Sequence, residues 1–266
     1  MSWLRPYRDL KRSNVDGTVE VLRLAARHRT VPVHHVSTTG VFAASADNEP
    51  VGTAALTGPA HLLRNGYLQS KWVAEGVIGI ARSRGIPVSV YRVDVVCGDR
   101  ERGACQTKDF VWLSLKGSLQ AGAVPDRLTS RVHMVPVDYV SGAITTLATR
   151  DAAANGTFHL FNEQSQSFGD LVDHLRAFGY YLPETAWDAW RALIDADRDN
   201  AVTPLVDSFE EVNSEGAGPT YPPMDISDTE KALAGSGVVC PPIDRELFGR
   251  YVDFFVRSGY FPAPGR

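Results

Sequence analysis

The 266-residue sequence is poor in cysteine and lacks long hydrophobic runs. Its three cysteines, Cys97, Cys105 and Cys240, are an odd number at spacings that fit neither a zinc site nor a disulfide framework, which favours a reducing, cytoplasmic setting. No apolar stretch approaches the roughly 20 residues of a membrane span, and the charged N-terminus is unlike a signal peptide. We therefore expect neither a disulfide-rich secreted protein nor a membrane protein.

A strong excess of one charge is also missing. The chain carries 27 basic and 31 acidic residues, a net charge of −4, which argues against a general nucleic-acid or anionic-membrane binder. The charge is nevertheless uneven, with +7 over residues 1–150 and −11 over 151–266. A basic first part favours an anionic ligand or partner there, although solvated faces that differ by chance explain the split equally well.

A hydrophobic content of 44% is enough for a sizeable core, and its pattern indicates alternating helices and strands. Residues 14–29 and 67–84 have amphipathic helical spacing, and the β-branched segments 31–37 and 86–96 are typical of buried strands. This order, with short connections, indicates a parallel sheet covered by helices, an α/β fold. Further patterns predict a short strand over 156–162. They also predict three helices, over 110–119, 137–149 and 244–258.

The most informative residues are a hydroxyl residue after a predicted strand and a Tyr-x-x-x-Lys pair on the next predicted helix. Tyr67 and Lys71 are four residues apart, so they share a helix face, and the ammonium group is expected to lower the pKa of the phenol. Such a tyrosine can donate a proton to a developing alkoxide while a hydride arrives from a nicotinamide. Thr38, with Ser37 as the alternative, is expected to bind the same oxygen.

The Tyr-x-x-x-Lys spacing is weak when taken alone. Random placement of the tyrosines and lysines supplies about 0.17 matches in a chain of this composition, and two are present. Tyr7 and Lys11 form the other match, but no predicted strand with a hydroxyl residue precedes them. We interpret that pair as a chance match. The histidines His28, His34 and His35 have no carboxylate or cysteine at ligand spacing, so no metal site is expected.

Several stretches together resemble the extended short-chain dehydrogenases/reductases. They are more closely similar to the thioester reductase domains that end nonribosomal peptide synthetases and carboxylic acid reductases. The stretches occur in family order and, with weaker similarity towards the C-terminus, cover nearly the whole chain: NVDGTVEVLRLA (14–25), VSTTGVF (36–42), GYLQSKWVAE (66–75), VYRVDVVCGD (90–99), PVDYVSGAI (136–144) and FHLFN (158–162).

The resemblance implies a Rossmann-like catalytic domain over residues 1–155 and a mostly helical substrate-binding subdomain over 156–266. It implies NADPH-dependent reduction of an acyl or peptidyl thioester to an aldehyde or alcohol, with the substrate held by phosphopantetheine on a carrier protein. By this resemblance Tyr67 is the catalytic acid, Lys71 its partner and a contact of the cofactor ribose, and Thr38 the catalytic hydroxyl.

The resemblance also assigns residues around these three. Arg92, Val93, Asp94 and Val95 match the segment that lines the nicotinamide side of the cofactor site. Asn14, in the stretch NVDGT, is expected to brace the strand and helix geometry rather than to take part in the chemistry.

The sequence lacks one part that the family has, the Gly-rich turn that holds the cofactor pyrophosphate. Neither Gly-x-Gly-x-x-Gly nor Gly-x-x-Gly-x-x-Gly occurs in the sequence. Relative to the family the chain starts after the fourth strand, as in an N-terminally truncated reductase, so we expect a sheet without its first strands, weak NADPH binding and an edge open to self-association. Two alternatives stay open: redox-neutral cyclisation or release of a tethered thioester, and a non-catalytic remnant that binds a carrier protein.

Overall fold

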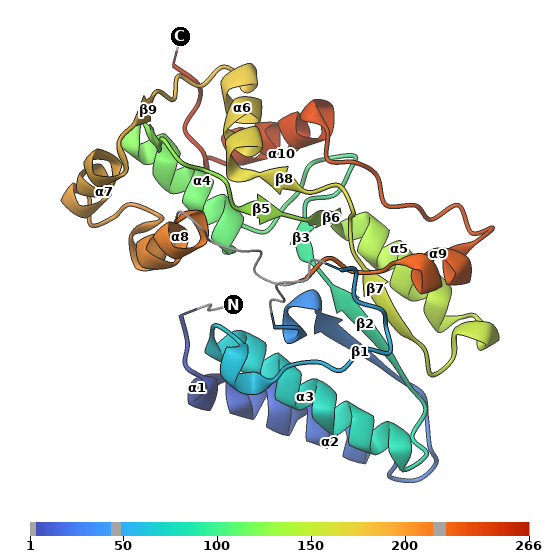
Figure 1. Cartoon of the computed structure of the whole chain (residues 1–266). Helices are drawn as coiled ribbons and strands as arrows, with labels where there is room; N and C mark the ends of the chain where they lie inside the picture. The colour runs from blue at the N-terminus through green and yellow to red at the C-terminus, as the bar shows by residue number, and fades with distance from the viewer. Residues whose placement is uncertain (1–3, 44–48, 215–221, 266) are drawn as a thin grey trace.

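A parallel three-stranded sheet forms the centre of one half of the protein. The computed structural model describes residues 4–43, 49–214 and 222–265. The sheet has the order β1, β2, β7, from Val33–Thr38, Val88–Val93 and Thr157–Leu160 (Figure 1). All pairs are parallel, with Thr38 opposite Val93 and Val93 opposite Leu160. Every residue of β2 is buried, which explains its nearly continuous apolar sequence. The predicted α/β parallel sheet is confirmed.

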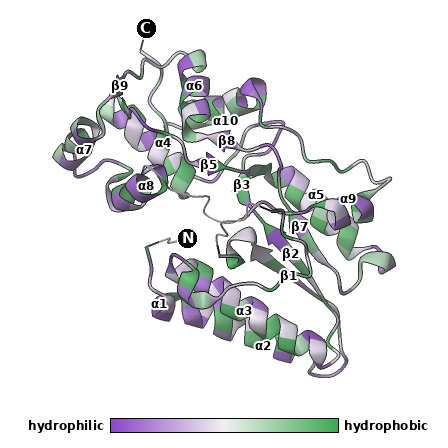
Figure 2. Cartoon of the chain, viewed as in Figure 1, coloured by the Kyte–Doolittle hydropathy of each residue, from purple (hydrophilic) through white to green (hydrophobic). Residues whose placement is uncertain are grey.

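Helices cover both faces of this sheet (Figure 1). Side chains of β2 alternate between the faces: Val88 and Val90 pack with residues of α2 and α3, whereas Tyr91 and Val93 pack with residues of α5 and α9. Figure 2 shows α2 and α3 banded with hydrophilic and hydrophobic residues, as expected for helices that rest one face on a sheet. These four helices span Gly17–Ala25, Gly66–Ser83, Val137–Ala148 and Ser227–Leu233.

The N-terminal helix differs from the prediction for residues 14–29. Helical structure begins earlier, with α1 at Tyr7–Lys11, and passes through a π-helical turn at Arg12–Asp16 before α2 begins. A π-helical turn adds one residue to the backbone ring, so it changes the face on which later residues lie. The change of register lies within the segment that holds Asn14.

The long helix α3 has clear signals at both ends. The side chain of Asn65 accepts a hydrogen bond from the backbone N–H of Leu68 at 3.0 Å, which caps the first turn. Gly85, just beyond the last turn, has φ +89°, a conformation that favours glycine. The helix predicted over 67–84 is confirmed, and Tyr67 lies in its first turn.

The strand predicted over 86–96 is divided in two. β2 ends at Val93, and after Asp94 the chain forms β3, Val95–Cys97, which pairs with β6, Met134–Pro136, instead of continuing beside β1. The Asp94 carboxylate accepts a hydrogen bond from the backbone N–H of Val95 at 2.7 Å, and this turn interrupts the ladder. The apolar run is continuous in sequence because both strands are buried or half-buried.

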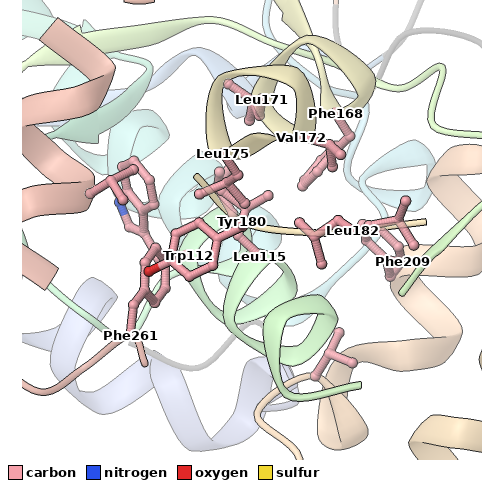
Figure 3. Close-up of a cluster of buried hydrophobic side chains, with 14 of the residues drawn as sticks. Trp112, Leu115, Phe168, Leu171, Val172, Leu175, Tyr180, Leu182, Phe209 and Phe261 are labelled. Carbon is pink, nitrogen blue, oxygen red and sulfur yellow. The ribbon is translucent and has the colours of Figure 1, made fainter. Parts of the chain in front are cut away.

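The other half of the protein is mostly helical (Figure 1). Its largest core contains Trp112, Phe248 and Phe255, all with 0% exposure, and Figure 3 shows the close packing of this cluster around Trp112. The elements are α4 (Phe110–Ala121), β4 (Val124–Pro125), β5 (Arg131–Val132), β8 (Gln166–Ser167), α6 (Phe168–Phe178), β9 (Glu184–Thr185), α7 (Trp187–Ala196), α8 (Val206–Asn213) and α10 (Arg245–Arg257). The helices predicted over 110–119, 137–149 and 244–258 and the strand over 156–162 are found with slightly different ends.

Both halves draw on chain from either side of residue 155. β7 pairs with β2 in the sheet, whereas α4 packs with α7 and α10 in the aromatic core. The division into 1–155 and 156–266 therefore stays a prediction. Across the described ranges, no helix is long and apolar enough to cross a membrane.

Candidate active site

The end of β1 and the first turns of α3 bring Thr38, Tyr67 and Lys71 into one region. β1 ends at Thr38, and the Lys71 side chain reaches back to this strand, where its Nζ donates a hydrogen bond to the carbonyl oxygen of Val36 at 2.6 Å. The Thr38 hydroxyl oxygen accepts a hydrogen bond from the backbone N–H of Gly40 at 3.2 Å. The strand exit and the Tyr-Lys face of the helix are thus joined by a direct contact.

The two candidate hydroxyl groups differ in their surroundings. The Ser37 hydroxyl is buried and donates a hydrogen bond to Oε2 of Glu75 at 2.5 Å. Thr38 is only half-buried, and as an acceptor from Gly40 its hydroxyl keeps its own proton for another partner. This geometry favours Thr38 over Ser37 as the hydroxyl that contacts a substrate oxygen.

Burial dominates the electrostatics of the Tyr-Lys pair. It raises the pKa of Tyr67 because the phenolate loses solvation. It also lowers the pKa of Lys71, an effect that the nearby Glu75 carboxylate opposes. The sequence spacing predicted that the ammonium group would lower the pKa of the phenol; in this structure the shift has the opposite direction. Burial therefore favours the protonated phenol over the phenolate.

Behind these residues lies a buried ion pair that the sequence-based predictions did not include. Nη2 and Nε of Arg92 donate to Oε1 of Glu75 at 2.6 and 3.0 Å, and the two side chains are only 7% and 9% exposed. Nη1 donates to the Thr53 carbonyl oxygen and to Nε2 of His159, both at 3.1 Å. The guanidinium group also lies 4.8 Å from the centre of the Phe42 ring.

A sequence signal for this pair exists. Glu75 falls four residues after Lys71 and eight after Tyr67, so it occupies the same face of α3, the face that packs on the sheet. A glutamate on a buried helix face needs a partner, and the one arginine within the apolar strand β2 can supply it. Through Ser37 and Arg92, Glu75 connects β1, α3 and β2.

The residues predicted to line the cofactor differ in exposure. Arg92 uses its guanidinium group on protein partners, and Val93 is part of the core of the sheet. Asp94 is buried in the turn between β2 and β3, and Val95 is half-buried and lines a cavity. A cofactor role for these four residues stays a prediction.

Asn14 has the contacts expected of a bracing residue. Its side-chain amide donates to the Ser70 hydroxyl oxygen at 2.8 Å, and that hydroxyl donates to the Tyr67 carbonyl oxygen, also at 2.8 Å. These bonds join the π-helical turn to the turn of α3 that carries Tyr67. Lys11, of the second Tyr-x-x-x-Lys match, instead pairs with Asp16 at 2.9 Å on the surface.

A cavity of about 150 Å³ adjoins this region. Its walls are largely apolar and come from β3, the start of α4, β5, α6 and α8, and Asn65 at the N-cap of α3 also lines it. Asp109, the N-cap residue of α4, lies at its border, and burial raises the pKa of this carboxyl group to about 7. No group of three or more His, Cys, Asp and Glu in the described part of the chain could hold a metal ion.

The side chains present fit one end of a nicotinamide dinucleotide. Tyr67, Lys71 and Thr38 supply hydrogen-bonding groups suited to a ribose and to a carbonyl beside the nicotinamide. The 266 residues contain no Gly-rich turn for the pyrophosphate. A helix-covered parallel sheet with this hydroxyl, tyrosine and lysine set defines a short-chain dehydrogenase/reductase type of domain.

Comparisons with known proteins specify the family. An NAD-binding family described as "Male sterility protein" matches residues 1–144. The chain belongs to this family, and within it to the terminal reductase domains of nonribosomal peptide synthetases. It is 35% identical, over 97% of its length, to a linear gramicidin synthase of Brevibacillus parabrevis, of which it spans 5%.

Two solved structures agree with this assignment. The terminal R domain from the myxalamid PKS-NRPS pathway has a TM-score of 0.89 and 35% identity, and the similarity covers 100% of this chain and 68% of that one. A thiolation-reductase di-domain from an archaeal non-ribosomal peptide synthetase has a TM-score of 0.75 at 23% identity, covering 95% of this chain and 54% of that one, and shows the shared fold.

Proposed function

We propose that this chain reduces a thioester, held by phosphopantetheine on a carrier protein, to an aldehyde or alcohol with NADPH. The observation that carries the proposal is the placement of Tyr67 and Lys71 on the α3 face next to β1, which ends at Thr38. The family supports a nicotinamide cofactor. The choice of NADPH rests on the resemblance and on the net charge of +7 over residues 1–150, which favours an additional phosphate.

The proposed chemistry assigns one role to each side chain. NADPH, when bound, supplies a hydride to the thioester carbonyl carbon. Tyr67 donates its phenolic proton to the carbonyl oxygen, and the raised pKa keeps that proton in place before the reaction. The Thr38 hydroxyl donates a hydrogen bond to the same oxygen. The resulting hemithioacetal loses its hydroxyl proton to sulfur as the carbon–sulfur bond breaks, which yields the aldehyde and the carrier thiol. A second NADPH would supply the hydride that, with a second proton, converts the aldehyde to the alcohol.

Lys71 has two functions in this proposal. Its ammonium group stabilises the phenolate that remains after proton transfer, and it hydrogen-bonds to the cofactor ribose. Its present acceptor, the carbonyl oxygen of Val36, holds the side chain close to β1. Glu75 and Arg92 hold the strand and helix from behind and touch neither reacting atom, so they are positioning residues.

The carrier protein is proposed as partner because the relatives are parts of assembly lines. The archaeal neighbour contains a thiolation and a reductase domain in one chain. The synthetase relative is far longer than the 5% that this chain spans, so substrates and partners of the whole protein are part of the proposal.

The edge of β1 is proposed as a second contact surface, open to self-association. Within the residues that the structure describes, β1 pairs with β2 alone. Val36 on this strand is 48% exposed, and Val21 on the neighbouring helix α2 is 54% exposed. An unpaired strand next to apolar side chains favours pairing with another chain.

Turnover of a synthetic acyl-pantetheine thioester tests the activity. We expect NADPH oxidation with stoichiometric release of free thiol, and a loss of roughly 100-fold or more in kcat for Tyr67→Phe. Tyr7→Phe is the matched control, because Tyr7 belongs to the second motif and should leave the rate unchanged. Calorimetry with NADPH and with NADH determines whether these 266 residues bind the cofactor and which one they prefer.

Two results would count against reduction, and a third against Tyr67 as the catalytic acid. Equal product formation with and without NADPH, abolished by Tyr67→Phe, would support redox-neutral cyclisation or release instead. No turnover together with carrier-protein binding that weakens at high salt would support a non-catalytic binding role. A rate unaffected by Tyr67→Phe would remove the assignment of the catalytic acid.

A further inference from the structure

The cavity beside the active site is lined by apolar side chains together with polar and charged ones. The apolar part comes from Val95, Phe110, Val132, Phe168 and Val212, on β3, α4, β5, α6 and α8. These residues come from segments far apart in the sequence, and Asn65 at the start of α3 also lines the cavity.

The charged residues that line the cavity have protein partners. Arg64 pairs with Glu211 at 3.6 Å, and Arg131 donates to the Ser165 side chain and carbonyl oxygen at 2.6 and 2.7 Å. Asp109 accepts hydrogen bonds from the Trp112 backbone at 2.9 Å and from the Gln106 amide at 2.5 Å. An apolar group can contact the apolar side chains of the cavity and leave these pairs in place.

The cavity lies next to elements that carry or adjoin the candidate catalytic residues. Asn65 lines the cavity and caps the helix turn that carries Tyr67. Val95 lines it as well and follows two residues after Val93, the register partner of Thr38. A group in the cavity is therefore next to the start of α3 and to β3.

The size of the cavity limits its occupant. A volume of about 150 Å³ equals that of an engineered, apolar protein cavity that stays dry and binds benzene. A long fatty chain exceeds this space, and a single methyl group leaves most of it empty.

We propose that this cavity binds the acyl side chain of the thioester, and that this side chain is a compact apolar group of roughly the size of benzene, such as a phenyl or short branched alkyl group. The proposal rests on the reductase function proposed above and adds to it the chemical class of the substrate.

Binding of thioethers tests the proposal without turnover. S-alkyl pantetheine thioethers lack the carbonyl group, so they cannot be reduced, and calorimetry on the full chain measures their affinity. We expect roughly fourfold tighter binding for each methylene added to S-methyl pantetheine, as burial of about 0.8 kcal/mol per methylene implies, until the cavity is full. S-benzyl should bind tightly, and S-carboxyethyl no better than S-methyl.

Two variants with a control locate the binding site. Val212→Phe fills the cavity and should weaken S-benzyl binding at least tenfold while S-methyl binding stays unchanged. Val132→Ala enlarges the cavity and should shift the preference towards longer chains, which keeps the test valid if the first variant does not fold. Val239→Phe is the control, because Val239 is 72% exposed and lies outside this cavity.

The outcomes separate this inference from the reductase function. Equal affinity for all the thioethers, or no measurable binding of any, overturns the inference. Preference for S-benzyl without NADPH-dependent turnover supports the cavity and contradicts the reductase function. Turnover of acyl thioesters at rates independent of the acyl group contradicts the cavity alone.

Discussion

The regions around α4 and around α3 are both well buried, but by different side chains. Around α4 and α10 the core is aromatic, with the ring centres of Trp112 and Phe255 4.9 Å apart. Around α3 and β2 the interior contains a carboxylate, a guanidinium group and an imidazole joined by hydrogen bonds. Apolar packing stabilises the fold without a strong directional preference. Burial of the ionic cluster costs the hydration of its charged groups, and its hydrogen bonds fix the orientation of the side chains. The directional cluster lies directly behind the candidate catalytic residues.

The largest effect is expected in the aromatic region. Phe255→Ala removes a ring with 0% exposure that packs against Trp112 and Phe261, so the free energy of unfolding should fall by about 4 kcal/mol. Urea unfolding measures the change. Tyr181→Ala is the control because Tyr181 is 87% exposed, and its effect should stay within about 0.5 kcal/mol. Equal effects of the two substitutions would show that this cluster does not carry the stability.

A slightly smaller loss is expected when the ionic cluster is broken on one side. Arg92→Met leaves the Glu75 carboxylate buried with the Ser37 hydroxyl as its remaining donor, and should cost about 3 kcal/mol in urea unfolding. Replacement of both charges, Glu75→Met with Arg92→Met, should recover most of that loss and still lower turnover. Recovery of both stability and turnover would contradict the positioning role.

The ionic cluster, unlike the aromatic core, should make stability depend on pH through His159. Burial, with Arg92 beside it, lowers the pKa of His159 from 6.5 to about 4. The unfolded chain therefore takes up a proton that the native state resists, so this stabilisation is complete above pH 6.5 and is lost as the pH falls towards 4. The expected loss is about 2 kcal/mol between about pH 7 and about pH 5.

His159→Gln should reduce this slope, measured by urea unfolding at several pH values. Burial also lowers the pKa of His35 to about 4, so part of the slope should remain. His61→Gln is the control, since His61 is an exposed residue outside the cluster. An unchanged slope in His159→Gln would show that the imidazole is not held neutral by the cluster.

The smallest effect on stability is expected at the sheet edge. Val36→Lys should change the free energy of unfolding by less than about 0.5 kcal/mol because Val36 is 48% exposed. The same substitution should reduce self-association in sedimentation experiments, since charged residues on edge strands oppose pairing. Identical sedimentation of both proteins at high concentration would remove this edge as a contact surface.

The helices and strands of the sheet region could be predicted from the sequence better than the break after β2 and the pKa shift of Tyr67. Regular spacing located α3, and the order of strands and helices indicated the parallel sheet. The division after β2 was missed because both strands are apolar and the decisive Asp94 turn is local. The direction of the Tyr67 pKa was missed because the pattern shows the lysine four residues away but not the depth of burial.

The partners of Glu75 and the cavity could not be predicted for a related reason. Arg92 is 17 residues from Glu75, and the cavity collects side chains from Arg64 to Val212. Such contacts depend on tertiary packing, which spacing along one helix or strand does not contain. The aromatic core was foreseen only as a helical C-terminal part, without its partner α4.

The π-helical turn at Arg12–Asp16 has a consequence for how this protein can change over evolution. A single-residue deletion there would leave a regular α-helix of unbroken hydrogen bonding, which local energetics would tolerate. It would also rotate Asn14 away from Ser70 and release the support beneath the turn that carries Tyr67. Because α1 and this turn both pack on α3, such a deletion would shift the support of the helix that carries Tyr67, so the length of this segment is tied to the geometry of the candidate active site.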